Sequence, residues 1–370
     1  MRTIVNTVDR LHEKYDFYIV TRDHDGPHDR EQYKTVEINS WNNIDNAKVF
    51  YLSKDNVKLS KLRQLIFEVD PDIYYANSFF ATPSIYLALL RKLSLIPKRS
   101  FIVAPCGELS DGALALKSKK KKYFIKLSKL FGLHSDIVWK ASSELEEAEI
   151  LRVKGARGEI DIAPDLPPRR LNEGFSVERK PKKEKGTAKF VFLSRVAEKK
   201  NLKWLFELIH LVEGEISIDV YGPIEDEIYW KECKTVIDTL PENVKVTSKG
   251  PIPYETTAEL LLGYHFFVLP TLSENFGHVF LEALSAGCPL VISDRTPWLG
   301  LENSSIGWDI PLENPACWVE TLNKCVAMES SEYKRMSESA RKYSLEWLSN
   351  PQIEKDTVNL IERTLKSNPN

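Results

Sequence analysis

This sequence of 370 residues has no long apolar run, no strong bias of charge and no cysteine pattern. None of its hydrophobic stretches approaches the length of a membrane span and no signal peptide is visible, so we expect neither a spanning helix nor export. The formal net charge is only -2, so nothing global favours nucleic acid as a partner. Five cysteines without a C-x-x-C pair suit a reduced cytoplasmic protein better than a disulfide framework.

Two kinds of ligand site are also poorly supported. The chain has no G-x-G-x-x-G pattern, which argues against a dinucleotide-binding Rossmann domain. One loop is rich in residue types that bind metals, namely Asp23, His24, Asp25, His28 and Asp29. No other segment offers a matching partner, so a solvated loop is the better interpretation. We therefore predict no metal and no other cofactor.

Length and composition predict a two-domain α/β protein. With 42% hydrophobic and 28% charged residues, a chain of 370 residues is long enough for two separate cores. In the second half, short apolar strands alternate with helices, as in the strand Lys189–Ser194 and the helix Asn201–Val212. Further strands are expected at Ile216–Tyr221, Val244–Ser248, Phe266–Leu269 and Leu290–Ser293. This alternation is typical of a parallel, doubly wound sheet, whose ligands lie beyond the carboxyl ends of the strands.

The first half shows a similar alternation. Its expected strands are Phe17–Thr21, Val49–Leu52, Ile73–Tyr75, Phe101–Ala104 and Ile137–Lys140. Between the halves, residues 179–187 are highly charged, contain proline and glycine and have no periodicity, which is typical of a surface linker. The predicted domains are therefore residues 1–178 and 188–345, with a linker over 179–187 and a terminal helical segment over 346–370.

The segment Pro270–Asp294 carries the strongest functional signal. It is expected to form a loop, a helix and a strand, with Glu274 in the loop and Glu282 in the helix. The helix is apolar nearly all round, so it should be buried rather than amphipathic. Because a buried carboxylate is rare unless it is paired, Glu282 requires a ligand or a buried donor. This pattern indicates a binding site.

The stretch Glu274-Asn-Phe-Gly-His-Val-Phe-Leu-Glu282 resembles the E-x7-E motif of retaining glycosyltransferases of family 4, the group 1 type, which have the GT-B fold. The resemblance implies two Rossmann-like domains that face a central cleft, with the last helix packing back on the first domain. It also implies that Glu274 contacts sugar hydroxyls of a nucleotide-sugar donor and that Glu282 holds the ribose. Hydrogen bonds to charged groups contribute roughly 1.5–3 kcal/mol each, which suits this role. The alternative is a buried helix whose glutamate pairs with a basic residue.

Further candidates for donor binding follow the expected strands. Arg195 and Lys200 flank the turn after the strand Lys189–Ser194, and a guanidinium with an ammonium suits a diphosphate leaving group. The family has arginine and lysine at the same spacing, so the resemblance assigns this role to both, against the alternative of a solvated basic turn. The start of the motif helix adds Asn275, Phe276, Gly277 and His278. By resemblance, the backbone near Gly250 and Ile252 would contact the nucleobase of a UDP-type or GDP-type donor.

The first domain offers weaker candidates. The resemblance implies that it starts with a strand and a glycine-rich loop, whereas Met1–Asn6 reads as the helix that follows them. We therefore expect this domain to lack its first strand. Asn77, Gly107 and Glu108 follow expected strands and are candidates for contacting the acceptor, while a cap or turn role for Glu108 fits the sequence equally well.

The segment Lys117–Leu133 is the most biased part of the chain. It contains seven lysines and no acidic residue, interleaved with aromatic and aliphatic residues. A basic amphipathic helix is typical of a surface that meets anionic lipid, and the family often works on lipid-linked acceptors. The alternative is a solvated helix over the domain core. Nucleic acid is not supported, because no aromatic stacking positions are apparent outside this stretch.

The family resemblance, together with these features, implies a hexosyltransferase that moves a hexose from a nucleotide diphosphate sugar to a hydroxyl of a glycan or lipid-linked acceptor, with retention at the anomeric carbon. The resemblance places it in cell-surface polysaccharide or lipopolysaccharide assembly. We expect a cytoplasmic protein that is peripheral at the inner face of the membrane. The alternative function is a non-catalytic GT-B scaffold that binds a nucleotide sugar or a protein partner.

Overall fold

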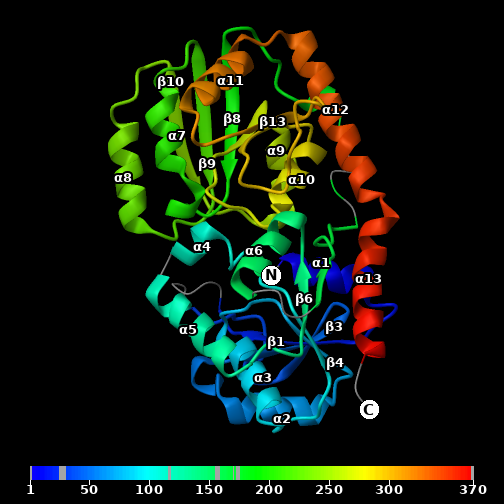
Figure 1. Ribbon diagram of the computed structural model, residues 1–370. Coiled ribbons are helices and arrows are strands. Elements are labelled where there is room, and N and C mark those ends of the chain that lie inside the picture. The colour runs from blue at the N-terminus through cyan, green and yellow to red at the C-terminus, as the bar shows by residue number, and fades with distance from the viewer. Residues whose placement is uncertain are drawn as a thin grey trace. The chain divides into compact units, whose positions relative to one another are not determined.

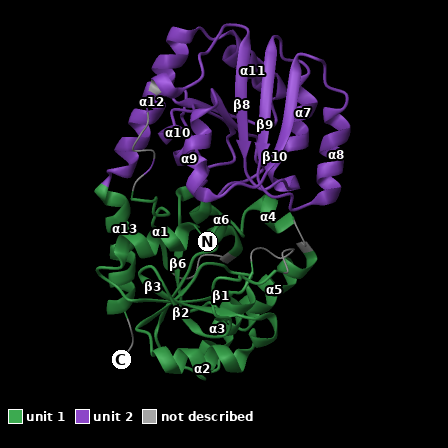
Figure 2. Cartoon of the chain, turned by 180° about the vertical axis from the view of Figure 1, so that it is seen from behind, with its two compact units in different colours: residues 1–169, 351–370 green, residues 170–350 purple. Residues whose placement is uncertain are grey.

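The chain divides into two compact units. The computed structural model describes residues 2–24, 31–115, 118–154, 159–169, 171 and 176–367. Unit 1 comprises residues 1–169 and 351–370, and unit 2 comprises residues 170–350 (Figure 2). Unit 2 thus begins before the expected linker and ends after residue 345, because its last helix, α12, runs from Ser330 to Leu348. Among the described residues, no helix combines the length and the apolar character needed to cross a membrane.

Unit 2 is built on a six-stranded sheet with the strand order β10-β9-β8-β11-β12-β13 (Figure 1). Its strands are β8 (Thr187–Leu193), β9 (Glu215–Tyr221), β10 (Val244–Gly250), β11 (Phe266–Leu269), β12 (Leu290–Ser293) and β13 (Gly307–Ile310). All neighbouring strands are parallel. Successive strands extend the sheet first from β8 towards β10 and then from β11 towards β13, so the sheet is doubly wound. The five strands predicted in this half are confirmed within a few residues, and β13 was not predicted.

The helices of unit 2 fall into two packed groups. They are α7 (Leu202–Ile209), α8 (Glu227–Ile237), α9 (Thr257–Leu262), α10 (His278–Ser285), α11 (Pro315–Ala327) and α12. Helix α7 packs on α8 and α11, whereas α10 packs on α9 and α12. The centre of the sheet between them is buried, since all four residues of β11 and of β12 are buried, and Ser293 is the one polar residue among these eight. This arrangement explains why these strands read as continuous apolar runs.

The predicted surface linker is instead an integral part of unit 2. A short 3-10 turn covers Val177–Arg179, and the side chains of Lys180 and Lys183 that follow are buried. The Nζ atom of Lys183 donates to the carbonyl oxygens of Val326 at 2.9 Å and Met328 at 3.0 Å, at the end of α11. These bonds satisfy carbonyl oxygens that the end of α11 leaves without helical partners. Lys183 therefore stabilises the fold of unit 2 and does not lie in a solvated linker.

Unit 1 contains two sheets. The first has the order β1-β3-β2, and the second is a parallel sheet with the order β4-β5-β6-β7. The strands are β1 (Phe17–Arg22), β2 (Trp41–Ile44), β3 (Ala47–Leu52), β4 (Ile73–Ala76), β5 (Ser100–Val103), β6 (Val138–Ala141) and β7 (Glu159–Ile162). Strands β1 and β3 are parallel, while β2 forms an antiparallel hairpin with β3. The five predicted strands are confirmed, and β2 and β7 were not predicted.

The helices of unit 1 include segments from both ends of the chain. They are α1 (Arg2–Leu11), α2 (Leu59–Val69), α3 (Thr82–Lys92), α4 (Asp111–Ala115), α5 (Ser118–Leu130), α6 (Glu144–Lys154) and α13 (Pro351–Lys366). The helix expected at the start of the chain is present as α1. Helix α13 joins unit 1 through ion pairs of Glu354 with Lys14 and of Arg363 with Glu159.

Candidate functional site

The loop that carries Glu274 is fixed by two neighbouring strands. It leaves the buried strand β11, and the Leu272 amide then donates to the carbonyl oxygen of Lys199 at 2.9 Å, beyond the end of β8. The Glu274 amide donates to the carbonyl oxygen of Arg295 at 2.9 Å, beyond the end of β12. Because β11 lies between β8 and β12, these bonds hold the loop at the carboxyl edge of the sheet. This is the edge where parallel α/β sheets bind ligands.

A glycine and a tryptophan shape the start of α10. Gly277 has a φ of 74°, and a Cβ there would lie 2.5 Å from the Phe280 ring and 3.1 Å from the Glu274 Cγ. Only glycine accepts this backbone without strain. On the other side, the Trp298 Nε1–H donates to the carbonyl oxygen of Phe276 at 2.6 Å, and the indole is buried. The candidate donor residues between Glu274 and α10 are therefore held in one conformation.

Helix α10 has the burial that its composition predicts. The side chains of Phe280, Leu281 and Leu284 are buried, and that of Glu282 is buried with them. His278, at the first position of the helix, stacks edge-on against Phe276 with ring centroids 4.8 Å apart. Glu282 is therefore a buried carboxylate within an apolar helix, as the sequence predicts. Their roles toward a donor remain predictions.

The structure pairs two of the predicted catalytic residues. The Lys200 Nζ atom forms a hydrogen-bonded ion pair with Glu274 Oε2. Only 9% of the Lys200 side chain and 19% of the Glu274 side chain are exposed. Burial acts to raise the pKa of Glu274, but the charge and hydrogen bond of Lys200, with the charge of Lys199, hold that pKa below its ordinary value. Glu274 is therefore a carboxylate at neutral pH, with a cation in direct contact.

Arg195 lies beyond the same strand but has another partner. Its Nη1 donates to Glu225 Oε2 at 2.6 Å, and 60% of its side chain is exposed. Glu225 follows β9, and sequence reasoning did not identify it. Both predicted cations thus lie beyond β8 as expected, and each contacts a carboxylate. Two cations that follow the same central strand can hold a diphosphate once these contacts are exchanged.

The predicted nucleobase region lies at the end of β10. Gly250 is the last residue of that strand, with a φ of 75°, and its carbonyl oxygen accepts from the Gly222 amide at 2.9 Å. Ile252 is half-buried two residues further on. Gly250 therefore ends a strand of the sheet that also carries Arg195, and Ile252 follows that strand. Their contact with a nucleobase stays a prediction.

The acceptor candidates of unit 1 have structural partners. Glu108 accepts hydrogen bonds from the Ser78 hydroxyl at 2.8 Å and from the amides of Phe79 at 2.6 Å and Phe80 at 3.0 Å. The Gly107 amide donates to Glu146 Oε1 at 2.7 Å. These contacts favour the turn role for Glu108 that the sequence left open.

Asn77 is half-buried, as Glu108 is. Its Oδ1 lies 3.9 Å from the Sγ atom of Cys106, which follows β5. Asn77 itself follows β4, the neighbouring strand, so the two residues meet at the carboxyl edge of the second sheet. Contact of Asn77, Gly107 or Glu108 with an acceptor stays a prediction.

No metal site emerges in the part of the chain that the structure describes. No cluster of three or more histidine, cysteine, aspartate or glutamate residues is suited to a metal among those residues. Asp23 is buried and pairs with His24 Nδ1 at 2.6 Å and with Gln32 Nε2 at 2.6 Å. The remaining three metal-binding residue types of this loop lie outside the described residues; they are Asp25, His28 and Asp29.

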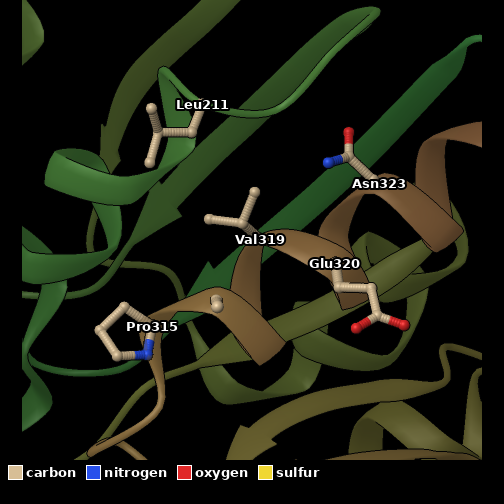
Figure 3. Close-up of a pocket in the computed structure, with 6 residues that line it drawn as sticks. Leu211, Pro315, Val319, Glu320 and Asn323 are labelled. Carbon is tan, nitrogen blue, oxygen red and sulfur yellow. The ribbon is translucent and has the colours of Figure 1, made fainter.

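An open pocket of about 560 Å³ lies elsewhere on unit 2 (Figure 3). It is lined by Leu211, Pro315, Ala316, Val319, Glu320 and Asn323. These residues belong to α11 and to the segment after α7, and none is a candidate site residue. The Glu213 amide donates to Asn323 Oδ1 at 2.9 Å, near the beginning of β9 rather than its end. This pocket is therefore separate from the predicted donor site.

Sequence reasoning missed Glu225, Arg295 and Trp298. Arg295 could have been found, because it follows the predicted strand Leu290–Ser293 by two residues, as Arg195 follows β8. Glu225 and Trp298 carry no comparable signal. Their contacts arise from turns that only the folded sheet brings together.

Comparison with known proteins agrees with this geometry. Residues 175–343 match the family model "Glycosyl transferases group 1". The sucrose-phosphate synthase of Thermosynechococcus elongatus is 14% identical with a TM-score of 0.69, covering 98% of this chain and 92% of that chain. Anabaena HepE, solved with UDP and glucose, is 14% identical with a TM-score of 0.67, covering 98% of this chain and 96% of that chain. These structures show that the fold is of the GT-B type.

A curated relative matches over a shorter stretch. The GtfA subunit of the UDP-N-acetylglucosamine–peptide N-acetylglucosaminyltransferase of Streptococcus gordonii is 25% identical over 114 residues, which is 30% of this chain. The match spans only 21% of that relative's own length. The fold and the family model together define the class of protein. Unit 2 matches the model of the glycosyl transferases group 1 family over residues 175–343, and the family resemblance seen in the E-x7-E segment is confirmed.

Proposed function

We propose that this chain is a retaining glycosyltransferase that moves a hexose from a UDP-type or GDP-type sugar to a hydroxyl of a glycan or lipid-linked acceptor. The observation that carries the proposal is the Lys200–Glu274 pair at the carboxyl edge of the sheet, where the buried helix with Glu282 begins. The family match supports the reaction class. The HepE structure with UDP and glucose supports a nucleotide-sugar donor, and the WaaB structure, a lipopolysaccharide galactosyltransferase, supports a glycan acceptor.

Each residue has a physical role in this proposal. Lys200 and Arg195 stabilise the negative charge that develops on the departing diphosphate, with the start of α10 as a third source of positive potential. Glu274 accepts from sugar hydroxyls and orients the anomeric carbon, and Glu282 holds the ribose. Retention follows the family resemblance, in which the departing diphosphate takes the acceptor proton on the same face of the sugar.

Donor binding has to replace the ion pair that the structure shows. Lys200 exchanges its contact with Glu274 for the diphosphate, and Glu274 exchanges the ammonium for sugar hydroxyls. Because both side chains are largely buried, removing one leaves the other charge without compensation. At position 274, glutamine also removes the charge, but it keeps the size of the side chain and an oxygen that can accept from Lys200, so it is a cleaner probe than alanine.

The proposal is tested by donor binding followed by turnover. A panel of UDP-sugars and GDP-sugars is titrated calorimetrically against the full chain, and release of the nucleotide diphosphate is then measured with and without glycan acceptors. We expect Glu274→Gln to bind the donor but to lose roughly 100-fold or more in turnover. The control Glu259→Gln alters an exposed carboxylate that pairs with Arg179, and it should keep its rate.

Two results would decide against this reading. Near-normal turnover of Glu274→Gln would remove Glu274 from the mechanism. The scaffold alternative would be favoured if the unmodified chain bound one donor selectively but neither released the nucleotide diphosphate nor transferred the sugar to any acceptor of the panel.

Glu282→Ala should chiefly raise the Kd of the donor, since its expected contact is with the ribose.

A surface of unit 1 supports a membrane-associated acceptor. On α5 and the residue after it, Tyr123, Leu130 and Phe131 are exposed. Exposed lysines accompany them at positions 119, 120, 122, 126 and 129, whereas Lys117 lies outside the described residues. Phe124 faces inward and packs on Phe79 with ring centroids 5.5 Å apart. A helix anchored on one side, with lysines and apolar side chains on the other, suits the surface of an anionic bilayer.

Vesicle binding tests this surface. The full chain should sediment with vesicles that contain phosphatidylglycerol and not with pure phosphatidylcholine vesicles. Lys119→Glu/Lys122→Glu should lower the partition coefficient at least tenfold, because each lysine contributes about 1 kcal/mol near an anionic surface. The control Lys342→Glu alters an exposed lysine of α12 and should bind like the unmodified chain. Equal binding to both vesicle types would contradict the proposal.

The five cysteines form no disulfide, which fits a reducing compartment such as the cytoplasm.

A further inference from the structure

Glu225 places a negative charge beside Arg195, one of the two cations of the proposed donor site. It lies in the segment that follows β9, and Ile224 forms a parallel bridge with Val196. The Glu225 amide donates to the Val196 carbonyl oxygen at 3.1 Å, and its carboxylate contacts Arg195 Nη1 at 2.6 Å. Backbone bonds therefore hold the turn that carries Glu225 against the turn that carries Arg195.

The two turns cannot easily move apart. A Cβ at Gly222, which opens the Glu225 turn, would collide with the backbone oxygen of Ser194. The Ser194 amide in turn donates to the Tyr221 carbonyl oxygen at 3.0 Å. Because β8 and β9 are neighbours along their full length, this close approach continues the pairing of the strands. Glu225 consequently stays near Arg195 whatever the guanidinium binds.

We propose that Glu225 competes with the donor diphosphate for Arg195 and so weakens the binding of both donor and product. This inference rests on the proposed function, because it assumes that Arg195 binds the diphosphate. A diphosphate offers a guanidinium more charge than one carboxylate does, so it displaces Glu225 from the contact. The displaced carboxylate then remains as a like charge near the diphosphate, and this repulsion raises the Kd.

The exposure of the pair permits this exchange. Of the two side chains, 60% of Arg195 and 25% of Glu225 are exposed, so the guanidinium can swing to a ligand without unfolding its surroundings. The Lys200–Glu274 pair differs in one respect. In the proposed function, Glu274 accepts hydrogen bonds from the sugar hydroxyls when Lys200 leaves it. The displaced Glu225 makes no new contact with the nucleotide sugar. Glu225 therefore lowers affinity for the nucleotide, which favours release of the product.

Calorimetric titration with UDP and GDP tests the inference. For the nucleotide that binds, Glu225→Gln should lower the Kd about three- to tenfold at 50 mM NaCl, and less at 300 mM, because salt screens the repulsion. The control is Glu232→Gln, which removes the same charge from the ion pair between Lys203 of α7 and Glu232 of α8 and should leave the Kd unchanged. In the Arg195→Gln background, Glu225→Gln should have a smaller effect. Thermal unfolding checks that each variant is folded, and Glu225→Ala repeats the test with a second side chain.

The possible outcomes separate this inference from the proposed function. An unchanged or higher Kd in both Glu225 variants would overturn it, since Glu225 would then be neutral or would orient Arg195 for binding. If the unmodified chain binds neither UDP nor GDP, the proposed function fails and the inference fails with it. A lower Kd in Glu225→Gln but not in Glu232→Gln would support both.

Discussion

His265 should make unit 2 sensitive to mild acid. The ring is buried between the start of β11 and residues 181–189. Its Nδ1 accepts from the Lys189 amide at 3.1 Å, and its Nε2 lies 3.2 Å from the Pro181 carbonyl oxygen, to which only an N–H can donate. Both contacts are satisfied by the neutral ring with its proton on Nε2. Burial, together with the charges of Lys183 and Lys180, lowers the pKa of His265 from 6.5 to about 4.

The sign of the effect follows from proton binding. The folded ring binds a proton less readily than the unfolded one, so folding is stabilised above about pH 6.5, and this stability is lost as the pH falls towards 4. A difference of 2.5 pKa units corresponds to about 3 kcal/mol, of which about 2 to 3 kcal/mol should be lost between pH 7 and pH 4.5. The pKa of His134 in unit 1 is also lowered by burial to about 4, so unit 1 should respond in the same direction.

Urea unfolding at pH 7 and pH 4.5, followed by tryptophan fluorescence, measures this loss. In His265→Asn the amide oxygen keeps an acceptor for Lys189, and we expect the loss between the two pH values to shrink by about 2 kcal/mol. The control His210→Asn changes an exposed histidine after α7 and should unfold like the unmodified chain at both pH values. An acid-induced loss in His265→Asn equal to that of the unmodified chain would refute the assignment.

Two further substitutions probe the backbone of the donor loop and the buried charge of unit 1. Gly277→Ala forces a Cβ against the Phe280 ring and the Glu274 side chain at a φ of 74°. It should cost about 1–3 kcal/mol of stability and weaken UDP or GDP binding, and an unchanged melting temperature and Kd would contradict this. Lys140→Met leaves the buried carboxylate of Asp165 without its cation and should cost about 3–5 kcal/mol in urea unfolding. A cost below about 1 kcal/mol would show that Asp165 is compensated elsewhere.

The central strands of unit 2 and the donor motif could be predicted from the sequence for a simple reason. Strands such as Phe266–Leu269 are buried on both faces, so they appear as unbroken apolar runs. Residues that follow such strands must share one edge of a parallel sheet, which placed Arg195, Lys200 and Glu274 together in advance. The buried Glu282 was visible because a carboxylate in an apolar helix is exceptional.

Elements at the margins of the fold were less predictable. Strands β2, β7 and β13 lie at sheet edges. β2 and β7 are partly exposed, and β13 is mostly buried but contains a glycine and an aspartate, so none of the three has a continuous apolar run. Two lysines of the expected linker, Lys180 and Lys183, are buried because their ammonium groups meet backbone carbonyls far along the chain, such as Val326 for Lys183. Backbone acceptors leave no trace in the sequence, so a charged stretch of this kind reads as solvent-exposed.

The order of residues along the chain thus determined the alternation of strands and helices. It also determined which edge of the sheet is the predicted ligand-binding edge and which charged residues, for the most part, lie there. The tertiary structure alone decided how those charges pair. Lys200 meets Glu274, 74 residues away, and Arg195 meets Glu225, 30 residues away, because the sheet brings the ends of β8, β9 and β11 together. Ion pairing depends on distances of a few ångströms between turns, and sequence periodicity carries no information at that scale.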